Sequence, residues 1–453
     1  MAKLFGTDGV RGVAGVLLSA ELALALGKAA TRQVQTGRPR VLIVRDTRES
    51  GEMLQAALAA GVSAAGGEAL LGGVLPTPAA PLLLKRYGFD LAVVLSASHN
   101  PYYDNGVKFF GADGFKLDDD AELAIEEELV AGEGDTASAG GPATGAGDPA
   151  AHLAIGHVRE LRGTHEDYLR ELETRFSDLR LDGLDLLVDC ANGATYKVAP
   201  EIFRRLGANV TVLAAAPNGR NINAGCGSTH IESLGERVRT GKHALGFAFD
   251  GDGDRVLAVD REGVVVDGDE LIALAALHLR ERRRLAGDGV VVTVMTNYGF
   301  HSAMCDAGIE VACTNVGDRY VLEELRRNGW TLGGEQSGHI IDMGFNSTGD
   351  GLASALLTLE ALGGRDLAER DGMEKLPQRL VNVPVRDRTA LANAQIVTEA
   401  VENEDRALAG RGRVLVRSSG TEPLVRVMVE APTDEEAEEA CSRLVELVRR
   451  ELG

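Results

Sequence analysis

The chain has 453 residues, with 47 Lys and Arg against 68 Asp and Glu, which gives a formal net charge of −21. Its hydrophobic content of 44% is typical of globular proteins. A chain of this length is expected to form about three or four domains. So large a negative charge excludes nucleic acids and anionic membrane surfaces as general partners. A phosphorylated substrate would meet the same repulsion unless a local cluster of cations held it.

The cysteines and the hydropathy pattern narrow the class of protein further. The five Cys are scattered and form no CxxC pair, which argues against a disulfide framework and a thiolate zinc site and favours a reducing compartment. No stretch reaches the roughly 18 apolar residues of a membrane span, and the N-terminus has no apolar signal core. We therefore expect a cytoplasmic protein. Only 8 of the 47 basic residues are Lys, so a Lys inside a motif is notable.

Three stretches of the chain share one pattern: an apolar run, a polar turn, an amphipathic helix and, in two of them, a second apolar run. They cover residues 41–65, 184–213 and 289–311. Short apolar runs that alternate with helices imply strand–helix–strand crossovers. The pattern predicts an α/β fold in which helices pack on the faces of the sheets, with three copies of one domain type.

Changes in composition mark the expected boundaries. Residues 131–151 are rich in Gly and Ala without periodicity and predict an exposed connection. The acidic run 118–122 predicts a helix N-terminus, where carboxylates favour the helix dipole. A fourth unit is expected to begin near residue 372. It ends in a capping-box pattern, Thr433 to Glu436, that predicts a helix through about residue 451.

The first motifs in chain order place polar groups near the end of a strand. Gly6-Thr-Asp-Gly-Val-Arg-Gly12 could supply a cation, Arg11. Leu95-Ser-Ala-Ser-His-Asn-Pro101 follows an apolar run, and α/β proteins place their chemistry at such strand ends. A hydroxyl next to an imidazole suggests a serine hydrolase, although Ser98 does not lie in a G-x-S-x-G turn. Simple turn chemistry is the other interpretation of this segment.

Lys108 follows Ser98 by ten residues, in the sequence Asn105-Gly-Val-Lys108. A Lys held close to a cationic or metal site loses its proton more easily than a solvated one. We therefore expect Lys108 to be suited to general acid–base catalysis.

Asp250-Gly-Asp-Gly-Asp-Arg255 lies between two apolar runs and is the most informative hexapeptide of the chain. Three carboxylates at alternate positions converge only if the backbone curls, which glycine permits, and a hard divalent cation relieves their repulsion. An EF-hand does not fit, because Arg255 stands where Gly is needed and Arg261 where the bidentate Glu should be. A polar hairpin turn is the remaining alternative, and we favour a metal-binding loop that takes Mg²⁺.

Three later motifs suit a sugar phosphate. Gly333-Gly-Glu-Gln-Ser-Gly-His339 combines side chains that hydrogen-bond neighbouring sugar hydroxyls. Arg417-Ser-Ser-Gly-Thr-Glu-Pro423, followed by Arg426, offers guanidinium groups, hydroxyls and backbone N–H groups, which can hold a phosphate dianion. A Gly turn with a solvated Arg is the alternative. The block Val316-Gly-Asp-Arg319 could supply one more cation to the same site.

Six of these segments, in this order, resemble the α-D-phosphohexomutase superfamily, and the match spans nearly the whole chain. They are FGTDGVRG (5–12), SASHNP (96–101), NGVK (105–108), DGDGDR (250–255), GEQSGH (334–339) and RSSGTEP (417–423). Within the superfamily, KLFGTDGVRG, NINAGCGSTH (221–230) and GGEQSGH are most similar to the phosphoglucosamine mutase branch. Val44 departs from the family, whose members usually have Gly there. We interpret it as a packing variation that argues against a role for Arg45 or Arg48.

The resemblance implies a fold of four domains around a central cleft: three similar α/β domains with mixed sheets and a smaller C-terminal α+β domain. The implied ranges are 1–152 with the phosphoserine loop, 153–255 with the metal loop, 256–371 with the sugar loop and 372–453 with the phosphate loop. The implied activity interconverts glucosamine 6-phosphate and glucosamine 1-phosphate, for UDP-N-acetylglucosamine synthesis, through a phosphoserine enzyme and glucosamine 1,6-bisphosphate.

The resemblance also implies the site residues. Ser98 would carry the phosphoryl group, and one Mg²⁺ per subunit would bind Ser98, Asp250, Asp252 and Asp254. The other catalytic residues would be Lys108 as general base, Arg11 and Arg255 as charge-stabilising groups, and His99 and His339. Substrate would contact Glu335, Ser337, Arg417, Ser419, Gly420, Thr421 and Arg426.

Other functions stay open on the same scaffold and outside it. The nearest is a phosphoglucomutase/phosphomannomutase, and a different class is a non-catalytic protein that binds sugar phosphates. The expected partner is a small sugar phosphate, with no nucleic acid and no membrane, and a homodimer is compatible with the resemblance.

Overall fold

The computed structural model describes residues 4–6, 8–135, 155–419 and 423–453. It divides into two compact units, one within Met1–Val294 and Ala312–Arg370 and the other within Met295–Val311 and Asp371–Gly453. The first unit contains three sheets and the second contains one. In the described residues, no helix is long and apolar enough to cross a membrane.

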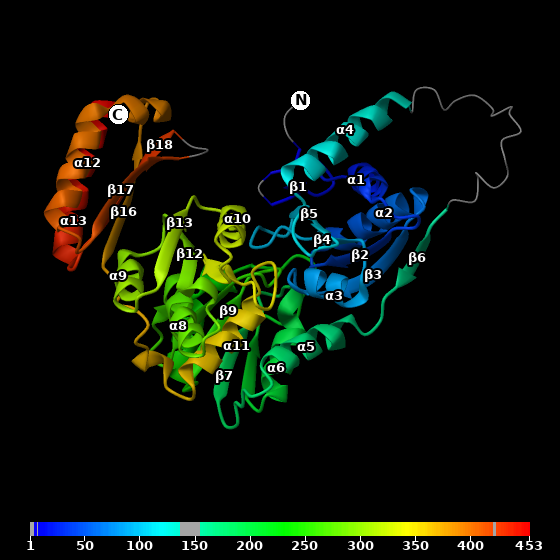
Figure 1. Cartoon of the computed structure of the whole chain (residues 1–453), viewed down its shortest axis with the longest axis horizontal. Helices are drawn as coiled ribbons and strands as arrows, with labels where there is room; N and C mark the ends of the chain where they lie inside the picture. Colours follow the sequence, from blue (N-terminus) through cyan, green and yellow to red (C-terminus); the bar gives the residue numbers. More distant parts are fainter. Residues whose placement is uncertain (1–3, 7, 136–154, 420–422) are drawn as a thin grey trace, which may run out of the picture. The chain divides into compact units, whose positions relative to one another are not determined.

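The first sheet has six strands in the order β1-β5-β4-β2-β3-β6. It is mixed, because β2 runs parallel to β3 and β4 while β5 is antiparallel to β4 and β1. Figure 1 shows α1 and α2 on one side of this sheet and α3 on the other. Its elements are β1 Val10–Val13, α1 Ala20–Gln33, β2 Arg40–Arg45, α2 Ser50–Ala64, β3 Glu68–Val74, α3 Ala79–Tyr87, β4 Leu91–Leu95, β5 Asp104–Gly111, α4 Asp119–Asp135 and β6 His157–Glu160.

The second sheet has five strands in the order β11-β10-β9-β7-β8, and it is mixed as well. Its parallel part is β8-β7-β9, and β10 turns back antiparallel to β9. Its elements are α5 Thr164–Arg175, β7 Asp185–Asp189, α6 Val198–Arg205, β8 Asn209–Leu213, α7 Glu232–Gly241, β9 Leu245–Phe249, β10 Val256–Asp260 and β11 Val265–Val266.

The third sheet has four strands in the order β13-β12-β14-β15, with β12 parallel to β14 and β14 antiparallel to β15. Asp267 begins α8 with a complete capping box, because its side chain accepts the Glu270 N–H while Glu270 accepts the Asp267 N–H. The elements are α8 Gly268–Glu281, β12 Gly289–Thr293, β13 Glu310–Thr314, α10 Asp318–Asn328, β14 Leu332–Gly334, β15 Ile340–Asp342 and α11 Gly351–Leu362.

The second unit holds an antiparallel sheet in the order β16-β18-β17 together with three helices. The Thr433 side chain accepts the Glu436 N–H at 3.2 Å, so the expected N-cap is present at the start of α13. The elements are α9 Tyr298–Asp306, β16 Gln378–Pro384, α12 Gln395–Leu408, β17 Arg413–Ser418, β18 Leu424–Glu430 and α13 Asp434–Leu452. The second unit also has a short 3₁₀ helix, Arg388–Asn393, and those in the first unit are Ala194–Tyr196, Ser228–His230, Ala286–Asp288 and Leu367–Glu369.

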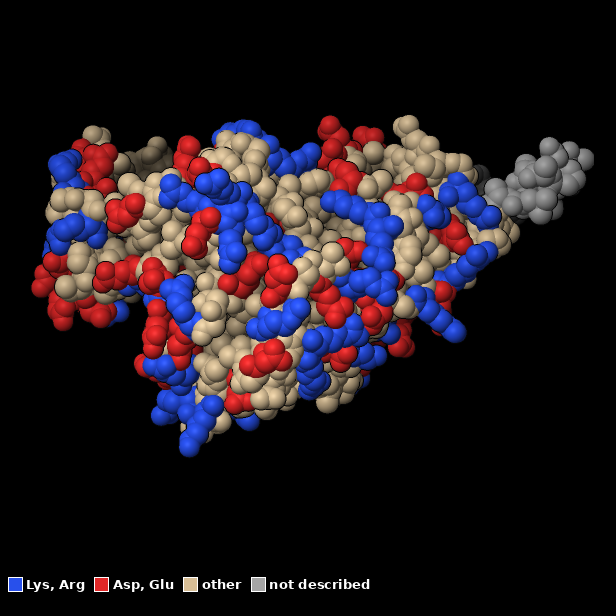
Figure 2. Space-filling view, turned by 60° about the horizontal axis from the view of Figure 1, so that its bottom comes forward, with Lys and Arg blue, Asp and Glu red and all other residues tan. Residues whose placement is uncertain are grey.

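The predicted fold class is confirmed: three mixed α/β sheets and a smaller C-terminal unit. The expected exposed connection 131–151 was too long at its start, because α4 continues to Asp135. Residues 136–151 of that connection lie outside the described residues. On the face shown in Figure 2, acidic and basic side chains are interspersed, so the negative charge is not gathered there into one patch.

Val44 lies in the buried run of β2, against a glycine. A Cβ on Gly72 would lie 2.8 Å from the Cγ1 atom of Val44. The larger side chain at residue 44 is therefore accommodated by the missing one at residue 72, which supports the interpretation of Val44 as a packing variation.

Two glycines let α1 and α2 approach closely. A Cβ on Gly61 would lie 2.0 Å from the carbonyl oxygen of Leu24, and a Cβ on Gly27 would lie 2.4 Å from that of Leu58. Each helix thus presents a glycine to the backbone of the other, and neither contact leaves room for a methyl group.

We predict that Gly61→Ala destabilises the protein, because the obstacle is backbone that cannot rotate away. The expected loss in the free energy of unfolding is at least about 1–3 kcal/mol, measured by urea denaturation. Gly37→Ala is the matched control, since a Cβ there meets nothing within 4 Å. Equal stability of the two variants would contradict the close helix contact.

Candidate active site

The loop between β9 and β10 brings three carboxylates together inside the protein. Asp250, Asp252 and Asp254 are all buried, and one carboxylate oxygen of each lies within 4.8 Å of the other two. Gly253 has a φ of 71°, a backbone conformation that lets the loop curl between the second and third carboxylates. The convergence expected from the DGDGDR motif is therefore present.

These carboxylates fit a hard divalent cation. The Oδ1 atoms of Asp252 and Asp254 are buried and have no hydrogen-bond partner among the described residues. Burial raises the pKa of Asp250, and the like charges of Asp254 and Asp252 raise it further. Unpaired oxygens and mutual repulsion are both relieved by a cation that prefers oxygen ligands, such as Mg²⁺.

Ser98 lies against this loop, in the turn after β4. Its Oγ donates a hydrogen bond to Oδ2 of Asp250 at 2.5 Å, although the two residues are 152 positions apart. Ser98 is 1% exposed and has a φ of 51°, in the left-handed region that residues other than glycine rarely adopt. The serine of the SASHNP motif and the carboxylates of the DGDGDR motif thus form one site.

Lys108 on β5 lies among carboxylates rather than beside other cations. Its Nζ is 2.9 Å from Asp252, 3.0 Å from Asp8 and 3.8 Å from Asp254. Burial opposes the charged form, but Asp252, Asp8 and Asp254 outweigh it and raise the pKa of Lys108. Attraction to these three carboxylates therefore favours the ammonium form, and the expected role of Lys108 as a general base stays a prediction.

The charge alternation continues outward from Lys108 through residues to which the sequence analysis gave no role. Asp8 pairs with Lys108 and, at 2.5 Å, with Lys116. Lys116 in turn pairs with Asp318 at 2.5 Å. Asp8 and Asp318 lie inside motifs that were noted for their arginines, and Lys116 is one of only 8 Lys, so weak signals for all three were present.

The two histidines have different surroundings. His339 is buried, with Nδ1 3.6 Å from Asp254 and Nε2 3.2 Å from the backbone nitrogen of Gly349. Burial opposes protonation, but Asp254 outweighs it and raises the pKa of His339. His99 has Nδ1 3.4 Å from the Ser98 Oγ, and burial, Arg255 and Arg11 lower its pKa.

A cavity of about 390 Å³ opens beside these groups within the first unit. Arg11 on β1 and Arg255 after the metal loop line it, together with Glu335 at the end of β14. The Glu335 carboxylate accepts the Gly317 N–H at 2.9 Å, which fixes its position at the cavity wall. The lining also includes Asp8, Asp254, Asp318 and His339, so the cavity brings residues of the first three sheets together.

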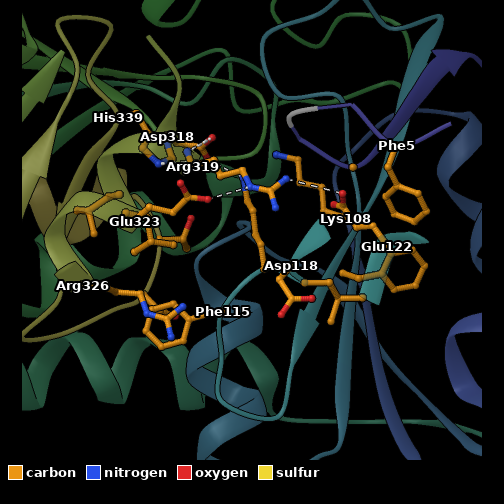
Figure 3. A pocket seen from close by; sticks show the side chains of 18 residues that line it. Phe5, Lys108, Phe115, Asp118, Glu122, Asp318, Arg319, Glu323, Arg326 and His339 are labelled. Atoms are coloured by element: carbon orange, nitrogen blue, oxygen red, sulfur yellow. Dashed lines mark hydrogen bonds and ion pairs between the residues drawn. The ribbon is translucent and has the colours of Figure 1, made fainter. Parts of the chain in front are cut away.

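Two residues expected in the site do not line this cavity. Ser337 is exposed and does not line this cavity. Arg319 lies at a neighbouring cavity, where its guanidinium pairs with Glu122 and Glu323 (Figure 3). It also pairs with Asp119. The expectation that Arg319 adds a cation to the substrate site is therefore wrong, because acidic side chains of α4 and α10 engage it.

The expected phosphate-binding residues belong to the second unit. Arg417 on β17 and Arg426 on β18 are register partners, and Ser419 is buried directly after β17. Burial lowers the pKa of Arg417, and the like charge of Arg426 lowers it further. Gly420 and Thr421 lie outside the described residues.

Comparison with known proteins shows which family the chain belongs to. Family models for phosphoglucomutase/phosphomannomutase match residues 2–134 (alpha/beta/alpha domain I), 166–263 (domain II), 267–380 (domain III) and 380–447 (C-terminal domain). A phosphoglucosamine mutase of Desulforudis audaxviator is 49% identical over 454 residues, covering 99% of this chain and 98% of that protein. The chain belongs to the phosphoglucosamine mutase family. It is thus an enzyme of the mutase class.

Solved structures share the fold of this phosphoglucosamine mutase family member. A phosphoglucomutase/phosphomannomutase family protein of Burkholderia thailandensis matches with a TM-score of 0.79 at 24% identity, covering 100% of this chain and 98% of that one. N-acetylphosphoglucosamine mutase of Aspergillus fumigatus, solved with GlcNAc-6P and magnesium, matches with a TM-score of 0.66 at 20% identity, covering 99% and 96%. The identity with both is too low to show more than the fold.

We predict that Mg²⁺ raises the melting temperature of the protein and that Asp254→Asn removes most of this effect. The substitution deletes a charged ligand, so the affinity for Mg²⁺ should fall at least about tenfold. Differential scanning fluorimetry with and without Mg²⁺ measures both changes. Glu262→Gln, an equal charge change on an exposed side chain, should keep the full Mg²⁺ response. An unchanged response of Asp254→Asn would refute the metal loop.

Proposed function

We propose that the chain interconverts glucosamine 6-phosphate and glucosamine 1-phosphate through a phosphorylated Ser98 and glucosamine 1,6-bisphosphate. The observation that carries the proposal is the hydrogen bond from the Ser98 hydroxyl to Asp250, within a loop whose carboxylates suit Mg²⁺. Full-length identity of 49% to a phosphoglucosamine mutase supports the choice of substrate.

The residues of the site would divide the phosphoryl transfer between them. A substrate hydroxyl attacks the phosphorus of phosphoserine 98, a new P–O bond forms and the bond to the Ser98 Oγ breaks. The hydroxyl proton passes to a base, and the reverse transfer returns the other phosphate to Ser98 after the bisphosphate has reoriented. Arg11 and Arg255, which line the cavity, would stabilise the charge of the transferred group.

One Mg²⁺ per subunit would be held by Asp250, Asp252 and Asp254 together with the Ser98 phosphate. When bound, the cation neutralises the charge on the phosphoryl oxygens. The A. fumigatus N-acetylphosphoglucosamine mutase was solved with magnesium, which supports the choice of this ion.

Lys108 is our candidate for the general base, with His99 and His339 as alternatives. Lys108 and His339 both lie beside Asp254, and His99 lies beside the Ser98 Oγ. Carboxylates hold Lys108 protonated in these contacts, so Lys108 would have to release its proton before it could accept one. All three positions border the serine or the metal loop, where a proton must move.

Substrate contacts complete the proposal. Glu335 and Ser337 would bind the sugar hydroxyls in both orientations, and exposed Ser337 would have to turn toward the sugar. The non-transferring phosphate would bind Arg417, Ser419, Gly420, Thr421 and Arg426, within domain 372–453. The other proposed domains are 1–152, 153–255 and 256–371. A cytoplasmic location and a homodimer stay predictions.

We predict that glucosamine 6-phosphate is the preferred substrate over glucose 6-phosphate and mannose 6-phosphate. The measurement is kcat/KM for each sugar phosphate in a coupled assay with Mg²⁺ and catalytic bisphosphate. A higher kcat/KM for either neutral sugar would instead favour a phosphoglucomutase/phosphomannomutase on the same scaffold.

We predict that Ser98→Ala abolishes mutase turnover and leaves the melting temperature nearly unchanged, because it removes only the hydroxyl that carries the phosphoryl group. Phosphopeptide mapping should find the phosphate on Ser98 in the wild-type protein and none at residue 98 in the variant. Ser177→Ala removes a hydroxyl from an exposed serine outside the site and, as a control, should keep a phosphorylated Ser98.

Three outcomes would contradict the proposed role of Ser98 in phosphoryl transfer. Turnover by Ser98→Ala would exclude a covalent role for the hydroxyl. Zero turnover by fully phosphorylated wild-type protein with Mg²⁺ would favour a non-catalytic sugar-phosphate-binding protein. Ester cleavage without Mg²⁺, with fluorophosphonate labelling of Ser98, would favour a serine hydrolase.

A further inference from the structure

The conformation of Ser98 is held in part by residues outside the motifs that carry the proposed chemistry. Its φ of 51° is unfavourable for any residue with a Cβ. Such a conformation persists only where surrounding contacts determine it, and it is often found at functional sites. The contacts that determine it here reach the backbone of Ser98 on both sides.

Arg48 holds the loop from the first sheet. Its Nη2 donates to the carbonyl oxygens of Ser98 at 2.8 Å and Asn100 at 2.9 Å. Its Nη1 donates to the carbonyl oxygens of Asp104, at 2.9 Å, and Pro101. With Nε donating to Asp46 at 2.8 Å, all five guanidinium N–H groups are engaged. Only a planar fork of donors can bind four carbonyl groups of one loop in this way.

A second side chain, that of Asn223, also binds the carbonyl group of Ser98. Its Nδ2 donates to the carbonyl oxygens of Ser98 at 2.9 Å and Asn100 at 3.2 Å. Asn223 itself has a φ of 58°, in the left-handed region where Asn is favoured over most residues. A Cβ on Gly251 would lie 2.6 Å from the Ser98 carbonyl oxygen, so the space around that oxygen is also closed from the metal loop.

The amide of Ser98 is fixed as well. The Ser96 Oγ accepts the Ser98 N–H at 3.0 Å and donates to Oδ2 of Asp46 at 2.6 Å. Asp46 is the same carboxylate that pairs with Arg48, and both side chains are fully buried. The network therefore clamps the N–H and the C=O of Ser98 and leaves its Oγ directed at Asp250.

We propose that Arg48 and Asn223 are positioning residues for phosphoryl transfer, which hold Ser98 in its left-handed conformation so that Oγ meets the metal loop. The inference rests on the proposed function. It gives Arg48 a role that the sequence analysis argued against, and it gives the NINAGCGSTH segment a task, because Asn223 is its third residue.

The test compares Asn223→Gly with Asn223→Ala in the full-length enzyme with Mg²⁺. Both variants lose the amide donor, but glycine tolerates the positive φ and alanine does not. We expect kcat for glucosamine 6-phosphate to fall by a similar factor in both, roughly 10- to 100-fold, with KM unchanged. The melting temperature should fall further in Asn223→Ala than in Asn223→Gly, because only alanine adds backbone strain to the loss of the hydrogen bonds. Asn221→Ala is the matched control, because the Asn221 side chain bonds Ala216 and Asn218 and, among the described residues, does not bond the Ser98 loop. Its kcat should stay at the wild-type value.

Arg48→Lys provides a second arm. The variant keeps a positive charge beside Asp46, but one ammonium cannot reach the carbonyls of Ser98, Asn100 and Asp104 together. We expect kcat to fall at least as far as in Asn223→Gly, again with KM unchanged. If Arg48→Lys does not fold, the two Asn223 variants still decide the question.

The outcomes separate this inference from the proposed function. Wild-type kcat in Asn223→Gly would overturn the positioning role, as would a rise in KM at constant kcat. No turnover of glucosamine 6-phosphate by the wild-type enzyme would instead count against the proposed function. In that case, the rate at which glucose 1,6-bisphosphate phosphorylates Ser98, followed by intact mass, decides the positioning role: equal rates in wild type and Asn223→Gly would overturn it.

Discussion

The site depends on the burial of three carboxylates within a few ångströms of one another. Asp250, Asp252 and Asp254 repel one another in a medium that screens poorly, and such a cluster persists only where opposite charges compensate it. Lys108 comes from the first sheet, and His339 lies between β14 and β15 of the third. The metal loop of the second sheet therefore requires its neighbours on both sides, and the three sheets of the first unit form the site together.

Lys108 is paired with a further carboxylate, Asp8, so the network of opposite charges continues outward from the metal loop. Lys108 and Lys116 share Asp8, and Lys116 continues to Asp318 at the start of α10. Cations and carboxylates alternate along this path, so each of these four charges has an opposite neighbour. A protein with a net charge of −21 can thus keep cations at one cavity, while exposed acids such as Asp119 and Glu323 engage Arg319 outside it.

What could be predicted from the sequence was the chemistry that short segments encode. The DGDGDR spacing predicts converging carboxylates because glycine allows the curl, and Ser98 follows a strand whose apolar run is plain. The pairing of Lys108 with Asp8 and Asp252 could not be predicted, because strand order sets which side chains meet. The same holds for Arg48, whose partners in the Ser98 loop lie 50 or more positions away and are backbone carbonyls, which leave no trace in residue type.

In the second unit, a buried carboxylate ties the start of α9 to β18. Glu430 on β18 is fully buried and accepts the Tyr298 N–H at 2.8 Å and the Arg413 Nε–H at 2.8 Å. Breaking either bond would leave a buried charge with fewer partners, so the start of α9 stays with this strand. Arg426 lies four residues earlier on β18, opposite Arg417 in the register. Like charges directly opposite across a sheet are unfavourable, and an anion at that end of the strand would relieve them. A single strand therefore carries both the buried anchor of α9 and one arginine of the proposed phosphate contact, so a shift of β18 would carry both together.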